Sequence, residues 1–245
     1  MEKHTLITIS RQFGSGGREV AEILAKKLGV RRYDKKIVEM AADNIEEGMD
    51  PREAVELSYN TPSNCLGNLG DYGYERVARH NRMYIEQAKV ILGVAEKESA
   101  VFLGRCADYI LKDKPNSYSF FIYADDDFRA KRAKTDYDGA TLEQLNKEET
   151  RRKQYYEFYT GQTWGAPEHY DLMINTSNMP LEDVADFIID YLRKNRGGGW
   201  PPWRDCRKWR QFFCAAGHGG GGGFRFSFGL IRKPARRWAN LINKF

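Results

Sequence analysis

Long apolar stretches are absent from this chain of 245 residues. No run of about eighteen apolar residues occurs, and the mean hydropathy is -0.66, so we expect no membrane-spanning helix. Near the N-terminus there is no basic segment followed by a long apolar core, so we also expect no secretory signal. These two absences favour a protein of the cytoplasm.

Cysteine is rare as well, at positions Cys65, Cys106, Cys206 and Cys214. None of these residues pairs with another at a short spacing, which favours free thiols in a reducing compartment. Cys206, Cys214 and His218 fit no familiar zinc-site spacing. The sequence therefore predicts neither a disulfide framework nor a metal site.

Acidic residues are nearly absent from residues 197–245, where ten Lys and Arg accompany Asp205 alone. This tail carries a charge of +9, and because the whole chain carries +5, residues 1–196 carry -4. Two glycine runs in the tail predict flexible linkers. Apolar residues at helical spacing beside cations end the chain: Trp238, Leu241, Ile242 and Phe245. The tail would suit an anionic surface, a partner's groove or single-stranded nucleic acid, or it is a disordered extension.

A glycine-rich motif follows a short apolar run near the start of the chain. Residues 6–9 are apolar or β-branched and predict a buried strand. Gly14, Gly16 and Gly17 come next, and apolar residues then recur at helical spacing over 20–28. A strand, a glycine turn and a helix bind phosphate well, because backbone N–H groups and the helix N-terminus face the ligand. The alternative is a tight turn that binds nothing.

The lysine and the hydroxyl of a standard P-loop are missing from this motif. That P-loop reads Gly, four residues, Gly-Lys, then Ser or Thr. Here Arg18 is the nearest cation after the glycines, and Glu19 follows it. The loop therefore favours phosphate binding, with Arg18 as a bidentate donor, but not magnesium binding through a loop hydroxyl.

Five short apolar segments alternate with helical patterns along the chain. They lie at 6–9, 30–34, 100–103, 119–123 and 172–176. This alternation predicts an α/β fold with a parallel five-stranded sheet covered on both faces. Ligands of such sheets bind beyond the carboxyl ends of the strands. The segments that would gather there are 14–18, 33–34, 104–105 and Asp125.

Several of these segments match the pattern of a known family. They are 7–19, Tyr33-Asp34-Lys35, Gly104-Arg105-Cys106-Ala107, 151–156, 159–161 and 171–176. With them the chain resembles the cytidylate kinase-like P-loop proteins of bacteria over residues 5–194. The resemblance implies a three-layer P-loop NTPase-like fold in residues 1–194. Within it, about 43–98 would form an acceptor-binding insert and about 137–165 a lid, and 195–245 would remain as a tail.

The resemblance also implies roles for individual residues. The donor phosphates of ATP would be held by Gly14, Ser15, Gly16, Gly17 and Arg18. The acceptor would be bound by Asp34, Gly104, Arg105, Asp108, Arg129 and Arg132. Catalytic charge would come from Arg18, Arg151 and Arg152, although the lid lacks the paired acid–arginine pattern of authentic cytidylate kinases. For each arginine the alternative is a solvated salt bridge.

The activity implied by the resemblance is ATP-dependent phosphoryl transfer to a nucleoside monophosphate, CMP or dCMP above all. Mg²⁺ would then be needed as the Mg-ATP complex. Two alternatives stay open at this point. One is a nucleotide-binding regulatory module without turnover, which the missing loop lysine favours. The other is a kinase for a different small acceptor, because a fold does not fix a substrate.

Overall fold

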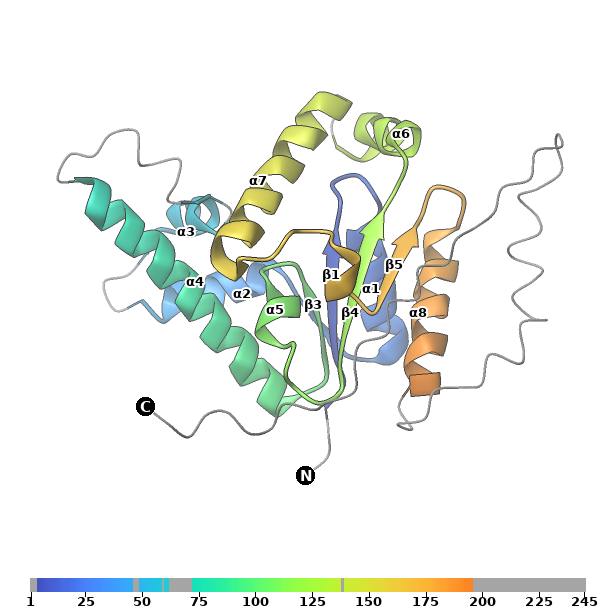
Figure 1. Ribbon diagram of the computed structural model, residues 1–245, viewed down its shortest axis with the longest axis horizontal. Helices are drawn as coiled ribbons and strands as arrows, with labels where there is room; N and C mark the ends of the chain where they lie inside the picture. The colour runs from blue at the N-terminus through green and yellow to red at the C-terminus, as the bar shows by residue number, and fades with distance from the viewer. Residues whose placement is uncertain (1–3, 46–48, 59, 62–71, 138, 196–245) are drawn as a thin grey trace, which may run out of the picture. The chain divides into compact units, whose positions relative to one another are not determined.

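The computed structural model describes residues 4–45, 49–58, 60–61, 72–137 and 139–195 (Figure 1). By its internal contacts Met1–Arg196 forms one compact unit. The predicted tail, apart from Asn195, lies outside the described residues. Three of the four cysteines and His218 also lie outside them, so the prediction about a metal site in that segment stays a prediction.

The prediction of five parallel strands is confirmed. The strands are β1 (Leu6–Arg11), β2 (Arg31–Tyr33), β3 (Ala100–Leu103), β4 (Ser117–Tyr123) and β5 (Leu172–Asn175). They form one parallel sheet in the order β2-β3-β1-β4-β5, in which Ile7 pairs with Val101 of β3 and Tyr118 of β4. Because β1 is central, the glycine motif that follows it lies at the middle of the carboxyl edge.

Helices cover both faces of this sheet, as an α/β fold requires (Figure 1). They are α1 (Gly17–Leu28), α2 (Lys35–Asp43), α3 (Pro51–Leu57), α4 (Tyr72–Lys97), α5 (Ala107–Ile110), α6 (Asp126–Asp136), α7 (Leu142–Thr160), the 3-10 turn η2 (Pro167–His169) and α8 (Leu181–Asn195). In the described part of the chain, no helix combines the length and the apolar character needed to cross a membrane.

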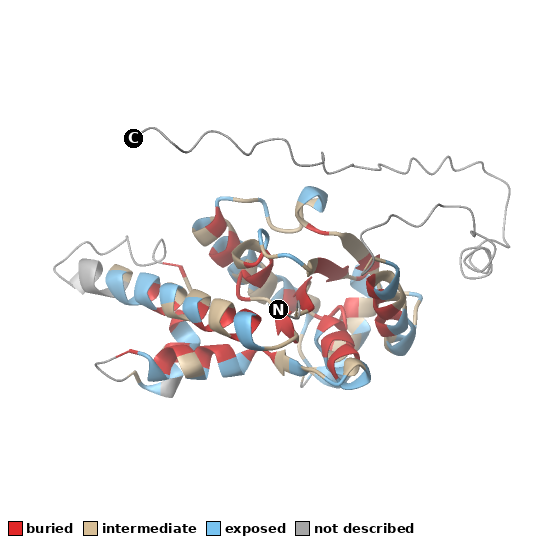
Figure 2. Cartoon of the chain, turned by 90° about the horizontal axis from the view of Figure 1, so that it is seen from below, coloured by how far each residue is buried: buried red, intermediate tan, exposed pale blue. Residues whose placement is uncertain are grey.

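Alternation along the strands sends side chains into two cores, one on each face of the sheet. Leu6 and Phe102 pack with side chains of α2 and α4, whereas Ile7 and Leu103 pack with those of α1 and α8. Figure 2 shows the buried residues of these helices on the sides that face the sheet. Both faces are covered, so the strands read as continuous apolar runs, which is the signal that predicted them.

Helix α7 lies across the carboxyl edge of the sheet and has its own start and stop signals. Thr141 and Gln144 form a capping box at its N-terminus, and Gly161 ends it in the left-handed conformation. Its C-terminal half joins an aromatic cluster in which the rings of Tyr84 and Tyr159 stack with centroids 4.1 Å apart. That cluster fixes α7 to α4, and the N-terminal half of α7 extends over the glycine motif.

Candidate functional site

The glycine loop joins the central strand β1 to α1. Gly14 and Gly16 have φ angles of 83° and 79°, in the left-handed region that glycine adopts most easily. Gly16 is the N-cap of α1, so the N-terminus of that helix opens directly onto the loop. A strand end, a left-handed turn and a helix start together form the geometry expected of a phosphate-binding loop.

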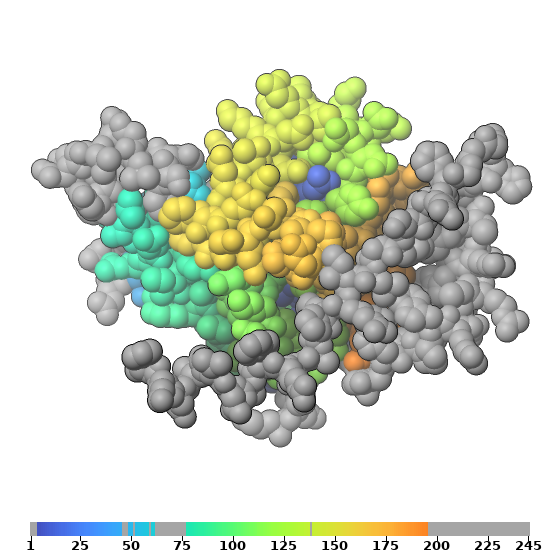
Figure 3. Space-filling view, in the orientation of Figure 1, coloured from blue at the N-terminus to red at the C-terminus, as the bar shows by residue number. Residues whose placement is uncertain are grey.

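Side chains of other elements pack closely against this loop. A Cβ on Gly14 would lie 2.7 Å from Leu145 Cδ2 of α7, and a Cβ on Gly16 would lie 2.8 Å from Leu181 Cδ2 of α8. Figure 3 shows the N-terminal segment on this face as a small blue area between the residues of α6 and α7. The glycines therefore have a packing reason to be glycine, besides any approach of the backbone to phosphate.

Ser15 holds the loop in place from inside. Its side chain is fully buried, and its Oγ donates to the carbonyl oxygens of Gln12 and Ile122 at 3.0 and 3.3 Å. The carbonyl of Ser15 accepts a hydrogen bond of 2.7 Å from Thr176 Oγ1. The hydroxyl of Ser15 is thus used within the protein, which leaves its backbone N–H as the group that can face a ligand.

Two arginines flank the loop, and the structure places them differently. Arg18, the second residue of α1, is exposed and has no ion pair with any residue that the structure describes. Arg11, the last residue of β1, has an exposed fraction of only 7%. Its Nη1 lies against Gly104, at the end of the neighbouring strand β3. Sequence reasoning assigned a role to Arg18 and none to Arg11.

Three consecutive residues after β3 have positive φ angles. The values are 70° for Gly104, 60° for Arg105 and 55° for Cys106. Each non-glycine residue in this region costs about 1–3 kcal/mol, and such strain clusters at functional sites. Burial raises the pKa of the Cys106 thiol well above its ordinary value, which favours the protonated thiol over the thiolate.

The strained turn places Arg105 beside Asp34, which caps α2 after β2. Arg105 is buried, and its Nη1 donates to the carbonyl oxygen of Ser58 at 3.0 Å. Its Nη2 lies 3.7 Å from Asp34 Oδ1, and Arg32 Nη1 lies 3.7 Å from Asp34 Oδ2. Two of the residues predicted to bind the acceptor are therefore brought together from separate strands.

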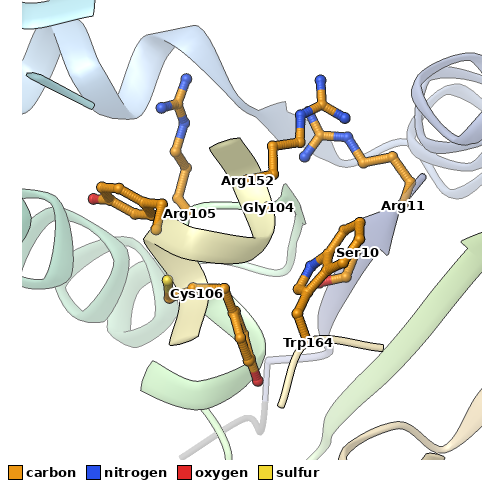
Figure 4. A pocket seen from close by; sticks show the side chains of 9 residues that line it. Ser10, Arg11, Gly104, Arg105, Cys106, Arg152 and Trp164 are labelled. Carbon is orange, nitrogen blue, oxygen red and sulfur yellow. The ribbon is translucent and has the colours of Figure 1, made fainter. Parts of the chain in front are cut away.

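A pocket at the ends of β1 and β3 gathers three arginines, Arg11, Arg105 and Arg152 (Figure 4). Its remaining lining consists of Ser10, Gly104, Cys106, Tyr155, Tyr156 and Trp164. The guanidinium groups project toward the same side of the pocket. Like charges repel, so a cluster of three cations at one cavity favours an anion of high charge, such as phosphate.

Of the two arginines predicted to act from the lid, one faces this pocket. Arg152 lines it, and its guanidinium lies 4.5 Å from the centroid of the Phe13 ring in the glycine loop. Arg151 is exposed and forms an ion pair of 2.9 Å with Glu148 on the same helix. The structure therefore brings Arg152, but not Arg151, to the predicted site.

Arg129 and Arg132, predicted to bind the acceptor, are engaged in contacts between helices. Arg129 Nε donates to the carbonyl of Phe13 at 2.8 Å, and its Nη2 lies 2.7 Å from Glu149 Oε2. Arg132 Nη2 lies 3.0 Å from Glu19 Oε1 and 2.8 Å from Asp136 Oδ2. These two side chains hold α6 against the loop, α7 and α1.

Asp108, also predicted near the acceptor, faces the C-terminal half of α7 instead. Its Oδ2 accepts a hydrogen bond of 2.8 Å from the hydroxyl of Tyr156. Burial raises the pKa of this carboxyl, although the hydrogen bond from Tyr156 acts in the opposite direction. In this position Asp108 links α5 to α7.

The described residues do not form a site for a protein-held magnesium ion. Among them, no group of three or more His, Cys, Asp or Glu side chains could hold a metal. The hydroxyl of Ser15 points at backbone carbonyls, and Glu19 is paired with Arg132. The hydroxyl of Ser15 and Oε1 of Glu19 therefore already have partners in the protein, whereas Oε2 of Glu19 is buried without a hydrogen-bond partner among the described residues.

Comparisons with known proteins place the chain in a family. The model of the cytidylate kinase-like family matches residues 6–178. A cytidylate kinase from Archaeoglobus fulgidus is 28% identical over 192 residues, which cover 75% of this chain and 92% of that protein. The crystal structure of an uncharacterized protein from Eubacterium ventriosum has a TM-score of 0.58 at 27% identity, covering 78% of this chain and 100% of that chain. Because the family model spans well over half of the sequence, this chain belongs to the cytidylate kinase-like family.

Proposed function

We propose that this chain is a kinase that transfers the γ-phosphoryl group of ATP to a nucleoside monophosphate, with CMP or dCMP as the preferred acceptor. The observation that carries the proposal is a glycine loop at a helix N-terminus next to a pocket lined by three arginines. Membership of the cytidylate kinase-like family supports the kinase class. The name of the Archaeoglobus relative supports the choice of acceptor.

In this proposal the parts of the site have separate tasks. The glycine loop binds the phosphates of ATP through its backbone N–H groups. Arg105 binds the phosphate of the acceptor, and Asp34 beside it contacts the nucleoside. Arg152 of α7 neutralises the phosphoryl group in transit, since phosphoryl transfer depends on alignment and positive charge more than on covalent help.

The pocket has a volume of about 30 Å³, which holds water but no nucleotide. Helix α7 must therefore move away for substrates to enter and close again over them, as lids of kinases do. Mg²⁺ would enter with ATP and neutralise phosphate charge there. Since the described residues offer no ligand set for it, the ion would be held by phosphates and water.

A regulatory module that binds a nucleotide without turnover is the second candidate. The observation in its favour is the loop itself, which has neither the lysine nor the following hydroxyl of a standard P-loop. A kinase for another small acceptor is the third candidate, because the same fold serves many substrates.

A coupled ADP-release assay on the full chain, with ATP and Mg²⁺, separates these candidates. CMP, dCMP, UMP, AMP and GMP are offered in turn, with EDTA in a parallel series. Fastest release with CMP or dCMP, abolished by EDTA, supports the proposal. ATP binding in calorimetry without ADP release for any acceptor supports the regulatory module. Full turnover in EDTA would contradict phosphoryl transfer from Mg-ATP.

A further inference from the structure

The cation missing from the glycine loop has a counterpart one strand end away. The Arg11 guanidinium is always charged and carries five N–H donors, and its residue is 7% exposed. Within the described parts of the chain, its side chain makes no hydrogen bond and no ion pair. Its nitrogen atoms are not sealed off by the protein but border the pocket, so the charge can bind an anion that enters there.

Other buried or half-buried arginines near the loop show what a structural role looks like in this chain. Arg129, with a side chain that is 4% exposed, donates to one backbone carbonyl and to three side chains. Arg132 pairs with two carboxylates. Among the residues that the structure describes, Arg11 has no such partner, and it lines the pocket with Arg105 and Arg152. Its environment therefore differs from that of a residue whose task is to hold helices together.

Two glycines leave the space that Arg11 occupies. A Cβ on Gly17 would lie 2.7 Å from the Cβ of Arg11 and 3.1 Å from its Cγ. A Cβ on Gly104 would collide with Nη1 of Arg11. The stem of Arg11 thus passes along Gly17, and its guanidinium ends over Gly104 at the pocket (Figure 4).

Compared with the standard P-loop pattern, the glycine and the cation at two positions, 11 and 17, are exchanged in this chain. Gly16 is the left-handed N-cap of α1 and corresponds to the second glycine of that pattern. The lysine position then falls on Gly17, and the first glycine position falls on Arg11. The cation and the glycine have changed places in the sequence: the stem of Arg11 lies against Gly17, and its guanidinium reaches Gly104 at the edge of the pocket.

We propose that Arg11 replaces the P-loop lysine and binds the phosphates of ATP. This inference rests on the proposed kinase function for its ligand. In standard P-loops a lysine binds the phosphates through a single ammonium group. The guanidinium of Arg11 would bind them through two N–H donors side by side. This proposal gives Arg11 the contact with the phosphates of ATP. From the sequence alone, that contact is predicted for Arg18, the nearest cation after the glycines.

The test measures binding of ATP, of tripolyphosphate and of CMP by calorimetry on the full chain. Arg11→Met removes the charge but keeps the length of the stem, and Arg11→Gln is a second neutral variant with a polar end. We expect both to weaken ATP and tripolyphosphate binding by roughly 10- to 100-fold, the worth of a charge-assisted contact. CMP binding should stay unchanged. Arg193→Ala, which removes an exposed charge from α8, is the matched control.

Two further variants sharpen the test. Arg18→Ala represents the rival assignment and should retain ATP binding. The double variant R11G/G17K restores the standard order of glycine and lysine, and it should regain most of the ATP affinity that Arg11→Met loses. G17K alone should lower the melting temperature, because the new side chain would meet the stem of Arg11.

The outcomes separate this inference from the proposed function. ATP affinity that survives in Arg11→Met and Arg11→Gln, or is lost in Arg18→Ala alone, overturns the role of Arg11 even if the protein is an active kinase. Loss of CMP binding instead of ATP binding also overturns it. If the wild type binds ATP but phosphorylates no acceptor, the proposed kinase function fails. The ATP affinities of the wild type and of the Arg11 and Arg18 variants then still show whether Arg11 binds the phosphates. A wild type that binds neither ATP nor tripolyphosphate overturns it as well.

Discussion

Arg129 of α6 and Glu149 of α7 form an ion pair with 2.7 Å between Nη2 and Oε2. The other carboxylate oxygen of Glu149 accepts from Gln12 Nε2 at 3.1 Å. Arg129 in turn donates to the carbonyl of Phe13. The carboxylate of Glu149 on α7 therefore contacts Gln12 at the start of the glycine loop directly and Phe13 through Arg129. This network holds α7 in the position that closes the pocket.

Glu149→Ala should lower the free energy of unfolding by about 1–3 kcal/mol, because it leaves donors of the buried Arg129 without an acceptor. Lys147→Ala, at an exposed position of the same helix, is the control and should change stability little. Urea denaturation of the two variants measures the difference. Equal stability of the two would mean that the ion pair does not hold α7.

The sheet was predictable because its strands are buried on both faces and read as apolar runs. The glycine loop and the turn at Arg105 were predictable too, since the carboxyl ends of parallel strands share one edge. The environments of single arginines were not. Arg129 and Arg11 look alike in the sequence, but the first meets Glu149 from a distant helix, whereas the second ends in a pocket. Such differences arise only when α7 packs over the loop.

Gly17→Ala should destabilise the protein by about 1–3 kcal/mol, because overpacking forces rigid neighbours apart. The added Cβ would meet the Cβ of Arg11 at 2.7 Å and that of Ile122 at 3.1 Å, and neither atom can rotate away. Gly93→Ala is the matched control, since a Cβ there meets nothing within 4 Å inside α4. It should stabilise by roughly 0.5–1 kcal/mol through helix propensity. Thermal denaturation with opposite shifts for the two variants is the expected result.

Arg105→Lys should weaken use of the acceptor far more than binding of ATP. Lysine keeps the charge but cannot donate to a phosphate, to Ser58 and toward Asp34 in the planar geometry of a guanidinium. We expect the KM for CMP to rise at least tenfold, since a bidentate contact to a charged group is lost. Steady-state kinetics give this value, and calorimetry gives the Kd for ATP.

Arg52→Lys, at an exposed position in α3, serves as the control for the exchange of arginine for lysine. Equal losses for CMP and ATP in the Arg105 variant would remove this residue from the acceptor site. An unchanged KM for CMP would do the same.

Asp108 provides a prediction about pH. Burial raises the pKa of its carboxyl above the ordinary value of 3.8, so the folded protein holds the proton more tightly than the unfolded chain. The contribution of this group to stability is therefore greatest at or below that ordinary value. It declines as the pH rises through the raised pKa, because the buried carboxyl must then ionise.

Asp108→Asn removes this loss and keeps an oxygen that accepts from the hydroxyl of Tyr156. We expect the variant to gain stability relative to the wild type, with the gain growing as the pH rises from the ordinary pKa of 3.8 through the raised pKa of the folded protein and staying constant above it. Asp113→Asn, at an exposed position, should show no such trend. Urea denaturation of all three proteins across this range tests it. If the difference between Asp108→Asn and the wild type is constant with pH, or shrinks toward neutrality, then the carboxyl of Asp108 ionises in the folded protein as easily as in the unfolded chain. The hydrogen bond between Asp108 of α5 and Tyr156 of α7 would in that case involve an ordinary ionised carboxylate and not a buried, protonated carboxyl.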